Sequence, residues 1–304
     1  MNEKQRLEII NLCKSIEKKN GEGSIYQLGS SKAKLNIPRT STCIEDLDAI
    51  IGGGIPQGRI IEIYGPESSG KTSLAFHLAS LYDLCLYIPA EGTFDAERAR
   101  VFGNRPKQLL IYNNTYGEDA MEKAIDFAKA GIPLIIIDSV PFLMPKYDYE
   151  TVEDNAEKDL RIGGVARLLT KTIPPLTKIC ERTGTTVIFI NQVRDKMDAM
   201  LFGEKTSTPG GHMLKHACSL RMQVARRQWI EVPNKNPANS AANEKIGLII
   251  KGKVTKSKIC NPYGEVELPM LFDRGFVSHD DVIEIRKEIM AKNRRRANKG
   301  DDDE

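Results

Sequence analysis

The sequence predicts an α/β fold built on a mostly parallel, twisted sheet with helices on both faces and an antiparallel extension. Apolar runs of strand length alternate with helix-length segments at residues 60–64, 85–88, 109–112, 134–137 and 187–190. Such alternation is typical of parallel strands joined by helical crossovers. After Ser219 three further runs, at residues 220–224, 246–254 and 265–272, follow one another without helices. These runs predict antiparallel strands that extend the same sheet.

Shorter segments connect or flank the predicted core. Residues 226–243 are polar and rich in Asn and Pro, which predicts an excursion between two strands. Residues 2–19 have helical periodicity and end at Asn20-Gly21, where glycine suits a helix C-terminus. Residues 280–291 predict one more helix before a charged tail, which is equally typical of a solvated extension and of a binding segment. We therefore expect an arm at residues 1–34, a core at 35–272 and a C-terminal helix with its tail at 273–304.

The composition is that of a folded chain. The 304 residues are 40% hydrophobic, which is enough for a sizeable core, and the apolar runs are far shorter than the ~20 residues of a spanning helix. The charged start lacks the apolar run of a signal peptide. The six cysteines have no metal-ligand spacing, which favours reduced thiols. We expect a cytoplasmic protein without a membrane partner, whose net charge of +3 does not by itself indicate nucleic-acid binding.

Residues 65–72 read GPESSGKT, a complete GxxxxGK[ST] phosphate loop between a predicted strand and a predicted helix at 73–82. The glycines let backbone N–H groups close around a phosphate, Lys71 reaches the β- and γ-phosphates, and the Thr72 hydroxyl ligates Mg²⁺. A chance match has odds of about one in a hundred, so a simple turn before a helix is a poor alternative. The predicted nucleotide-binding residues here are Gly65, Pro66, Glu67, Ser68, Ser69, Gly70, Lys71, Thr72 and Ser73.

Acidic and amide side chains follow other predicted strands. Asp138 ends the apolar run at 134–137, as an aspartate that holds Mg²⁺ through water beside Thr72 would. Glu91 and Gln192 come just after the runs at 85–90 and 187–191. Because ligands bind at the carboxyl ends of parallel strands, Glu91 is a candidate base for the attacking water and Gln192 a candidate γ-phosphate sensor. Without further context, Glu91 and Gln192 are equally well explained as ordinary polar residues at strand ends whose hydrogen bonds are satisfied.

The segment at 61–72 resembles the phosphate loop of RecA recombinases nearly letter for letter, including its Pro-Glu-Ser-Ser interior. Other segments match in the same order and extend the resemblance over residues 2–276, namely 21–25, 58–60, 90–91 with 95, 137–140, 189–192 with 194, 208–211 with 214–215, and 254–259. The resemblance implies a RecA-like ATPase core that uses ATP and Mg²⁺. It also implies a helical filament of this chain on single-stranded DNA, pairing with a homologous duplex, and a role in recombination, repair and the SOS response to DNA damage.

By the same resemblance, specific residues acquire roles at the nucleotide. Glu91 is similar to the catalytic glutamate, which acts together with Lys71, and Gln192 to the residue that couples ATP to the second DNA loop. Asp95 is similar to the aspartate that faces adenine. Lys256 and Lys258 resemble the pair that reaches the ATP of the neighbouring subunit. Without the resemblance, the sequence is equally consistent with these lysines being solvated side chains on an edge strand.

Two long, polar segments that contain glycine, at 147–164 and 195–211, are the expected DNA-binding loops. Basic side chains and glycine N–H groups there suit phosphates, and apolar ones suit wedging between bases, although apolar residues beside a loop also anchor in a core. The predicted DNA-binding residues are Arg167, Arg194, Lys196, Met197, Met200, Phe202, Lys205, Gly210, Gly211 and His212, and Lys215 is a further candidate for a phosphate contact.

The sequence departs from the family pattern at several positions. Arg98 stands where a tyrosine usually stacks on adenine, and since a guanidinium can stack too, Arg98 is a candidate nucleotide-binding residue. His216 replaces an interface phenylalanine, and His212 replaces an asparagine in the DNA loop. After Phe276 only about one helix is predicted, where bacterial relatives have a C-terminal domain. These features resemble a divergent member with a truncated C-terminal domain, such as a phage-encoded one.

Two other functions compete with the recombinase. One is a hexameric helicase of the same fold or a RadA-like branch-migration ATPase; the chain shows neither a zinc motif nor a helicase-type extra domain in its N-terminal part. The other is a DNA-coating protein that binds ATP without hydrolysing it, against which the complete set of Lys71, Asp138 and Glu91 argues.

Overall fold

The computed structural model describes residues 1–21, 24–26, 37–113, 115–153, 163–195, 206–233 and 243–300, of which 152, 153, 195, 206 and 293–300 are described for the backbone only. The chain divides into two compact units, Met1–Pro38 and Arg39–Glu304. The predicted divisions at residues 34 and 272 stay predictions.

In the first unit the described residues form helix α1 (Glu3–Asn20). A capping box begins the helix: the Asn2 side chain accepts a hydrogen bond from the Gln5 N–H at 2.9 Å, and the Gln5 side chain accepts one from the Asn2 N–H at 3.2 Å. Gly21 ends the helix with a φ of 96°, which glycine adopts without strain. The helix predicted at 2–19 is confirmed with a shift of one residue.

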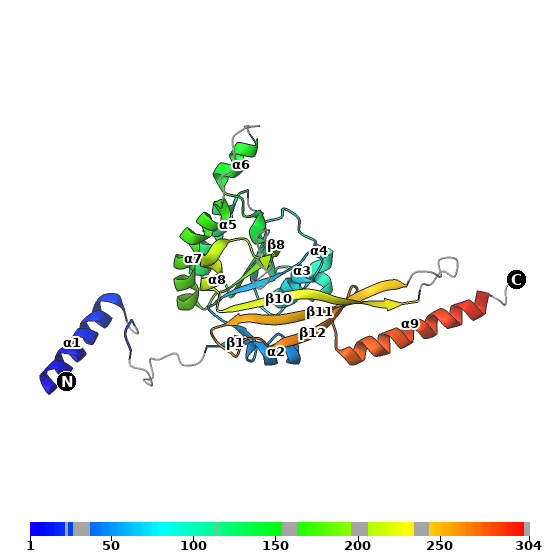
Figure 1. Ribbon diagram of the computed structural model, residues 1–304, viewed down its shortest axis with the longest axis horizontal. Coiled ribbons are helices and arrows are strands. Elements are labelled where there is room, and N and C mark those ends of the chain that lie inside the picture. The colour runs from blue at the N-terminus through cyan, green and yellow to red at the C-terminus, as the bar shows by residue number, and fades with distance from the viewer. Residues whose placement is uncertain are drawn as a thin grey trace. The chain divides into compact units, whose positions relative to one another are not determined.

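A large sheet forms the centre of the second unit (Figure 1). Its described strands are β3 (Ile60–Gly65), β4 (Cys85–Pro89), β5 (Leu109–Ile111), β6 (Leu134–Asp138), β7 (Thr186–Gln192), β10 (Leu220–Val232), β11 (Glu244–Ser257), β12 (Glu265–Leu271) and β13 (Gly275–Phe276). Their order in space is β13-β12-β11-β10-β3-β7-β6-β4-β5. Pairing is parallel from β10 to β5 and antiparallel from β10 to β13, which confirms the predicted sheet.

Helices cover both faces of this sheet. On one face, α2 (Glu45–Ile51), α3 (Lys71–Ser80) and α4 (Ala96–Val101) share a core with Ile61 and Ile63 of β3. On the other face, α5 (Gly117–Lys129), α7 (Gly164–Thr183) and α8 (Gly211–Ala217) pack with Ile60. Because neighbouring side chains point to opposite faces, a strand covered on both sides is apolar almost throughout. The carboxyl ends of β3, β4, β6 and β7 meet at one edge, the place where ligands bind in such sheets.

Strands β10 and β11 form a longer hairpin than the sequence predicts. Their pairing continues to Val232 and Glu244, so residues 226–232 belong to a strand and the predicted excursion is wrong there. Residues 234–242 lie outside the described ranges. The extension packs through Trp229, whose ring centroid lies 4.4 Å from the Arg226 guanidinium and 4.7 Å from the Lys245 ammonium. Because charged side chains stack on the aromatic ring here, the sequence lacks the alternation of apolar and polar residues by which a strand is recognised.

The sheet and its covering continue beyond residue 272. Strand β13 pairs with β12, and helix α9 (His279–Gly300) is longer than the predicted 280–291. Val282 of α9 lies in a small apolar cluster with Ile230, Ile249 and Leu271. No helix in the part of the chain that the structure describes is both long and apolar enough to span a membrane.

Candidate functional site

The phosphate loop joins β3 to α3 at the carboxyl edge of the sheet. Its two glycines are sterically required, because a Cβ added to Gly65 would lie 1.9 Å from the Val224 carbonyl oxygen and one added to Gly70 would lie 2.2 Å from Ile250 Cδ1. Gly70 also has a φ of 89°. A chain that turns this tightly into a helix N-terminus presents backbone N–H groups to an anion. The loop therefore fits a phosphate group.

Lys71, the first residue of α3, is buried and folds back over the loop. Its ammonium donates to the carbonyl oxygens of Gly65 at 3.1 Å and Pro66 at 2.6 Å. Burial lowers the pKa of Lys71, and the nearby carboxylates of Asp138, Glu91 and Glu67 oppose that shift. A buried cation held by carbonyl oxygens is a suitable partner for phosphate oxygens.

Thr72 and Asp138 meet across the site. The Thr72 hydroxyl donates a 2.8 Å hydrogen bond to Asp138 Oδ2, and the buried Tyr87 hydroxyl donates one of 2.6 Å to the same oxygen. Burial raises the pKa of Asp138, while the two hydrogen bonds oppose the shift. Hydroxyl and carboxylate oxygens are ligands that Mg²⁺ prefers. The two residues predicted to hold the metal are thus adjacent, and their chemistry fits it.

Glu91 follows β4 at the same edge and is exposed. The Ser139 hydroxyl donates a 2.8 Å hydrogen bond to Glu91 Oε1. Ser139 comes directly after Asp138. The same turn therefore positions both Asp138, the candidate metal ligand, and Ser139, the hydrogen-bond partner of Glu91.

A cavity of about 260 Å³ brings several predicted residues together. Its lining includes Thr72, Glu91, Asp95, Arg98 and Asp138. Asp95 caps the N-terminus of α4, where its Oδ1 accepts a hydrogen bond from the Arg98 N–H at 2.8 Å. The structure therefore places Asp95 in the same hollow as the catalytic candidates.

The Arg98 guanidinium is engaged with neighbouring groups. It donates to the Phe272 carbonyl oxygen at 2.9 Å and to the Ser73 hydroxyl at 3.4 Å. It also lies 5.1 Å and 5.7 Å from the ring centroids of Phe102 and Phe272. Stacking of this guanidinium on adenine stays a prediction.

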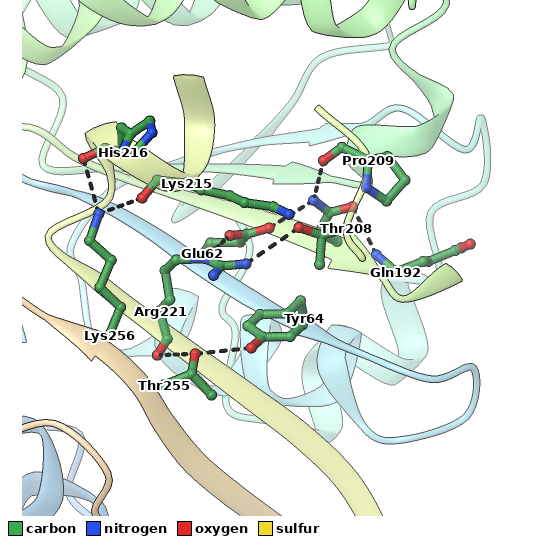
Figure 2. Close-up of polar contacts among 11 residues, drawn as sticks. Glu62, Tyr64, Gln192, Thr208, Pro209, Lys215, His216, Arg221, Thr255 and Lys256 are labelled. Atoms are coloured by element: carbon green, nitrogen blue, oxygen red, sulfur yellow. Dashed lines mark hydrogen bonds and ion pairs between the residues drawn. The ribbon is translucent and has the colours of Figure 1, made fainter. Parts of the chain in front are cut away.

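Gln192 ends β7 and connects the nucleotide edge to the second predicted DNA loop. Its N–H donates to Asn191 Oδ1 at 2.9 Å. Asn191 Nδ2 donates to Glu62 Oε1 at 2.8 Å and to the Pro209 carbonyl oxygen at 2.9 Å. Figure 2 shows Gln192, Pro209 and Glu62 around this set of contacts.

Lys256 and Lys258, near the end of β11, contact the last turn of α8. The Lys256 ammonium donates to the carbonyl oxygens of Lys215 and His216, the latter at 3.0 Å (Figure 2). The Lys258 ammonium donates to the His216 carbonyl oxygen at 2.7 Å. Burial, followed by the neighbouring Lys258 charge, lowers the pKa of Lys256. Cations favour the carbonyl end of a helix. The two ammoniums are therefore not simply solvated.

Comparison with known proteins covers most of the chain. Residues 8–277 match the sequence profile of the RecA N-terminal domain. The chain belongs to the RecA family. Protein RecA of Campylobacter fetus subsp. fetus is 34% identical, with 93% of this chain and 79% of that protein aligned. Protein RecA of Citrifermentans bemidjiense is 36% identical, with 90% of this chain and 78% of that protein aligned. Protein RecA of Sulfurovum sp. is 36% identical, with 92% of this chain and 79% of that protein aligned.

Membership of the RecA family confirms the resemblance seen in the sequence and, at a coarse level, the expected function. This chain is a RecA-family recombinase of DNA recombination and repair. Its RecA fold accounts for the mostly parallel sheet and the position of the phosphate loop.

The first predicted DNA loop of this RecA-family chain is partly helical. Residues 147–153 belong to α6 (Lys146–Glu153), in which Asp148 and Thr151 are buried, and Gly164 begins α7. The loop prediction is wrong for those residues, because a polar sequence concealed a short helix. Residues 154–162 lie outside the described ranges. Arg167 is exposed on the first turns of α7.

The second predicted loop leaves and re-enters the core through a pair of two-residue strands, β8 (Arg194–Asp195) and β9 (Thr206–Ser207). Arg194 is exposed. Gly210 and Gly211 have φ values of 96° and 73° and lead into α8, where the exposed His212 stacks on His216 with ring centroids 6.2 Å apart. Other predicted DNA-binding residues lie outside the described ranges, namely Lys196, Met197, Met200, Phe202 and Lys205.

Several residues of the site were not predicted from the sequence. Tyr87 and Ser139 hold the two acidic groups. Glu62, which is fully buried, forms an ion pair with the partly buried Arg221 beside Asn191. A charged residue inside the apolar run at 60–64 was a signal for Glu62, since buried charges require a partner.

Proposed function

We propose that this RecA-family protein is a DNA-dependent ATPase that assembles as a helical filament on single-stranded DNA and pairs that strand with a homologous duplex. One observation carries the proposal. Lys71, Thr72, Glu91 and Asp138 meet at one edge of the sheet, and Gln192 leads from that edge into the second predicted DNA loop. The candidate nucleotide site and the candidate DNA loop thus share one edge of the sheet.

The side chains at this edge suit hydrolysis of ATP to ADP and phosphate. Lys71 binds the β- and γ-phosphate oxygens in place of the loop carbonyl oxygens that it contacts now. Glu91, oriented by Ser139, accepts a proton from the water that attacks the γ-phosphorus, and ADP leaves on the opposite side. When bound, Mg²⁺ supplies positive charge to the β- and γ-phosphate oxygens, and Thr72 and Asp138 would hold it.

In the filament, Lys256 and Lys258 reach the γ-phosphate of the neighbouring protomer. Their contacts with the last turn of α8 support a link between that phosphate and DNA, because α8 directly follows the second loop. Each ammonium has three donors, so a lysine can bind a phosphate oxygen while it still contacts a helix carbonyl. Hydrolysis in the account therefore requires two protomers.

Two assays on the purified chain test the proposal together: ATP turnover with and without single-stranded DNA, and strand exchange between homologous substrates. We expect DNA to raise turnover at least tenfold and exchange to require homology. Unwinding of a forked duplex without pairing would instead identify a helicase or branch-migration ATPase. A protein that needs ATP to bind DNA but never hydrolyses the ATP would instead be a coating protein.

A further inference from the structure

A fully buried carboxylate lies beneath the second predicted DNA loop. Glu62 of β3 has 0% exposure, and it stands three residues before the first glycine of the phosphate loop. Its Oε2 accepts a 2.5 Å hydrogen bond from Arg221 Nε of β10, whose guanidinium also lies 4.7 Å from the Tyr64 ring centroid. A charge at this depth requires a fixed partner. The ion pair therefore has one geometry rather than many.

Both members of the pair are connected to the returning end of the loop. Arg221 Nη2 donates to the Thr208 hydroxyl at 3.3 Å. Asn191, which is also fully buried, bridges Glu62 Oε1 and the Pro209 carbonyl oxygen at 2.8 Å and 2.9 Å. Figure 2 shows Thr208 and Pro209 beside the pair. Two consecutive residues are thus held by one ion pair and its amide neighbour.

The same amide also contacts the candidate γ-phosphate sensor. Asn191 Oδ1 accepts the Gln192 N–H at 2.9 Å, so the two ends of one short side chain hold the sensor's backbone and the loop's carbonyl. A shift of Gln192 along its strand would have to move the amide, the Pro209 carbonyl or both. Buried hydrogen-bonded networks of this kind move between discrete arrangements, because an unpaired group inside the protein is costly.

We infer that Asn191, Glu62 and Arg221, here called the Glu62 triad, are positioning residues that transmit the state of the nucleotide site to the second DNA loop through Thr208 and Pro209. The inference rests on the proposed function and adds to it the physical connection between the two sites. None of the three side chains needs to touch nucleotide or DNA.

The test separates transmission from simple structural support. Asn191→Ala removes the bridge, and Thr208→Val removes the Arg221 contact while the ion pair stays intact. Thr208→Ser retains the hydroxyl and serves as the rescuing variant. Tyr64→Phe is the matched control, because it removes a 2.9 Å hydrogen bond to Thr255 in the same region without touching the loop.

Three quantities are measured for the full chain: the KM for ATP with basal turnover, the stimulation by single-stranded DNA, and hydrogen exchange of residues 206–217 with and without a non-hydrolysable ATP analogue. For Asn191→Ala and Thr208→Val we expect KM and basal turnover within twofold of the parent, and DNA stimulation at least fivefold lower. We also expect the analogue to lose its effect on exchange in residues 206–217. Thr208→Ser and Tyr64→Phe should behave like the parent.

Parent-like stimulation and exchange in folded Thr208→Val would overturn the inference, even if Asn191→Ala does not fold. An equal loss of basal and stimulated turnover would overturn it as well, since that pattern indicates structural support alone. A parent chain that binds and hydrolyses no ATP would instead contradict the proposed function. The two failures are therefore distinguishable.

Discussion

The Thr72 hydroxyl and the Asp138 carboxylate, 66 positions apart in the chain, are joined by a 2.8 Å hydrogen bond. Thr72 belongs to helix α3, which follows the phosphate loop and strand β3. Asp138 ends strand β6, which lies two places from β3 in the sheet. The parallel order β3-β7-β6 places both at one edge, so the sheet itself builds the site.

Glu91→Gln should abolish most ATP hydrolysis while the chain still binds ATP. The amide keeps the size of the side chain but cannot take a proton, and loss of a general base lowers rates by roughly 10²- to 10⁴-fold. Ser139→Ala, which removes the 2.8 Å hydrogen bond to Glu91, should give a smaller loss. Turnover and binding of a fluorescent ATP analogue are measured, with the exposed Glu97→Gln as the control. Turnover of Glu91→Gln within threefold of the parent would remove Glu91 from the mechanism.

Lys71→Ala and the double variant Lys256→Ala/Lys258→Ala should each lack ATP turnover alone and regain it when mixed. The first variant lacks the cation in its own site, and the second cannot serve its neighbour. In a random filament, about a quarter of the interfaces would combine an intact Lys71 with an intact lysine pair. DNA-stimulated turnover of the equimolar mixture should therefore approach a quarter of the parent value.

The control for this mixture replaces the lysine double variant with Lys129→Ala, an exposed position on α5, and should give about half of the parent turnover. A mixture of the first two variants that stays inactive would show that the lysines do not act across an interface. Turnover by the lysine double variant alone would do the same.

Asp138→Asn should stabilise the protein at neutral pH while it abolishes turnover. Burial raises the pKa of Asp138 above its ordinary value of 3.8. A carboxyl group whose folded pKa is raised contributes most to stability below the unfolded pKa, and that contribution is lost as pH rises through the folded pKa. The uncharged amide avoids this loss, so the gain in Tm should be largest near pH 7.5 and shrink as pH is lowered toward 4.

Thermal unfolding across this pH range checks the sign, with Asp83→Asn at an exposed position as the control. The control should show no comparable pH-dependent gain. If Asp138→Asn has a lower Tm than the parent at pH 7.5, the buried carboxylate is stabilising and the account of its environment is wrong.

Glu62→Ala should destabilise the fold by about 3–5 kcal/mol, because it leaves Arg221 partly buried without its partner. Replacing both residues by methionine should recover most of that loss, since apolar side chains replace a buried ion pair at little cost. Urea unfolding measures each variant, and Glu150→Ala, which breaks an exposed pair with Lys146, should change stability by less than about 0.5 kcal/mol. A double variant as unstable as Glu62→Ala would contradict this reasoning.

The sequence predicts much of the fold for clear physical reasons. Parallel strands buried on both faces are apolar almost throughout, so the runs at 60–64, 134–137 and 187–190 were visible. The phosphate loop was visible because its glycines stand where a Cβ would meet the Val224 backbone, at Gly65, or where φ is positive, at Gly70. Thr72 followed from the loop motif, and Asp138 from its place at the end of the apolar run at 134–137.

Contacts between distant segments were not predictable in this way. Arg221 lies 159 positions from Glu62, and no local pattern announces their pairing. The cap formed by Lys256 and Lys258 on α8 depends on how β11 passes that helix. Residues 226–232 and α6 were mistaken for irregular segments because polar side chains, including those around Trp229, hide their periodicity.

The most direct test of the central claim is joint-molecule formation between single-stranded DNA and a homologous duplex, with ATP and Mg²⁺ and a heterologous duplex as the control. We expect pairing with the homologous duplex only, and none with Lys71→Ala. Pairing that ignores homology, or a protein that hydrolyses ATP on DNA and unwinds forks without ever pairing strands, would contradict it.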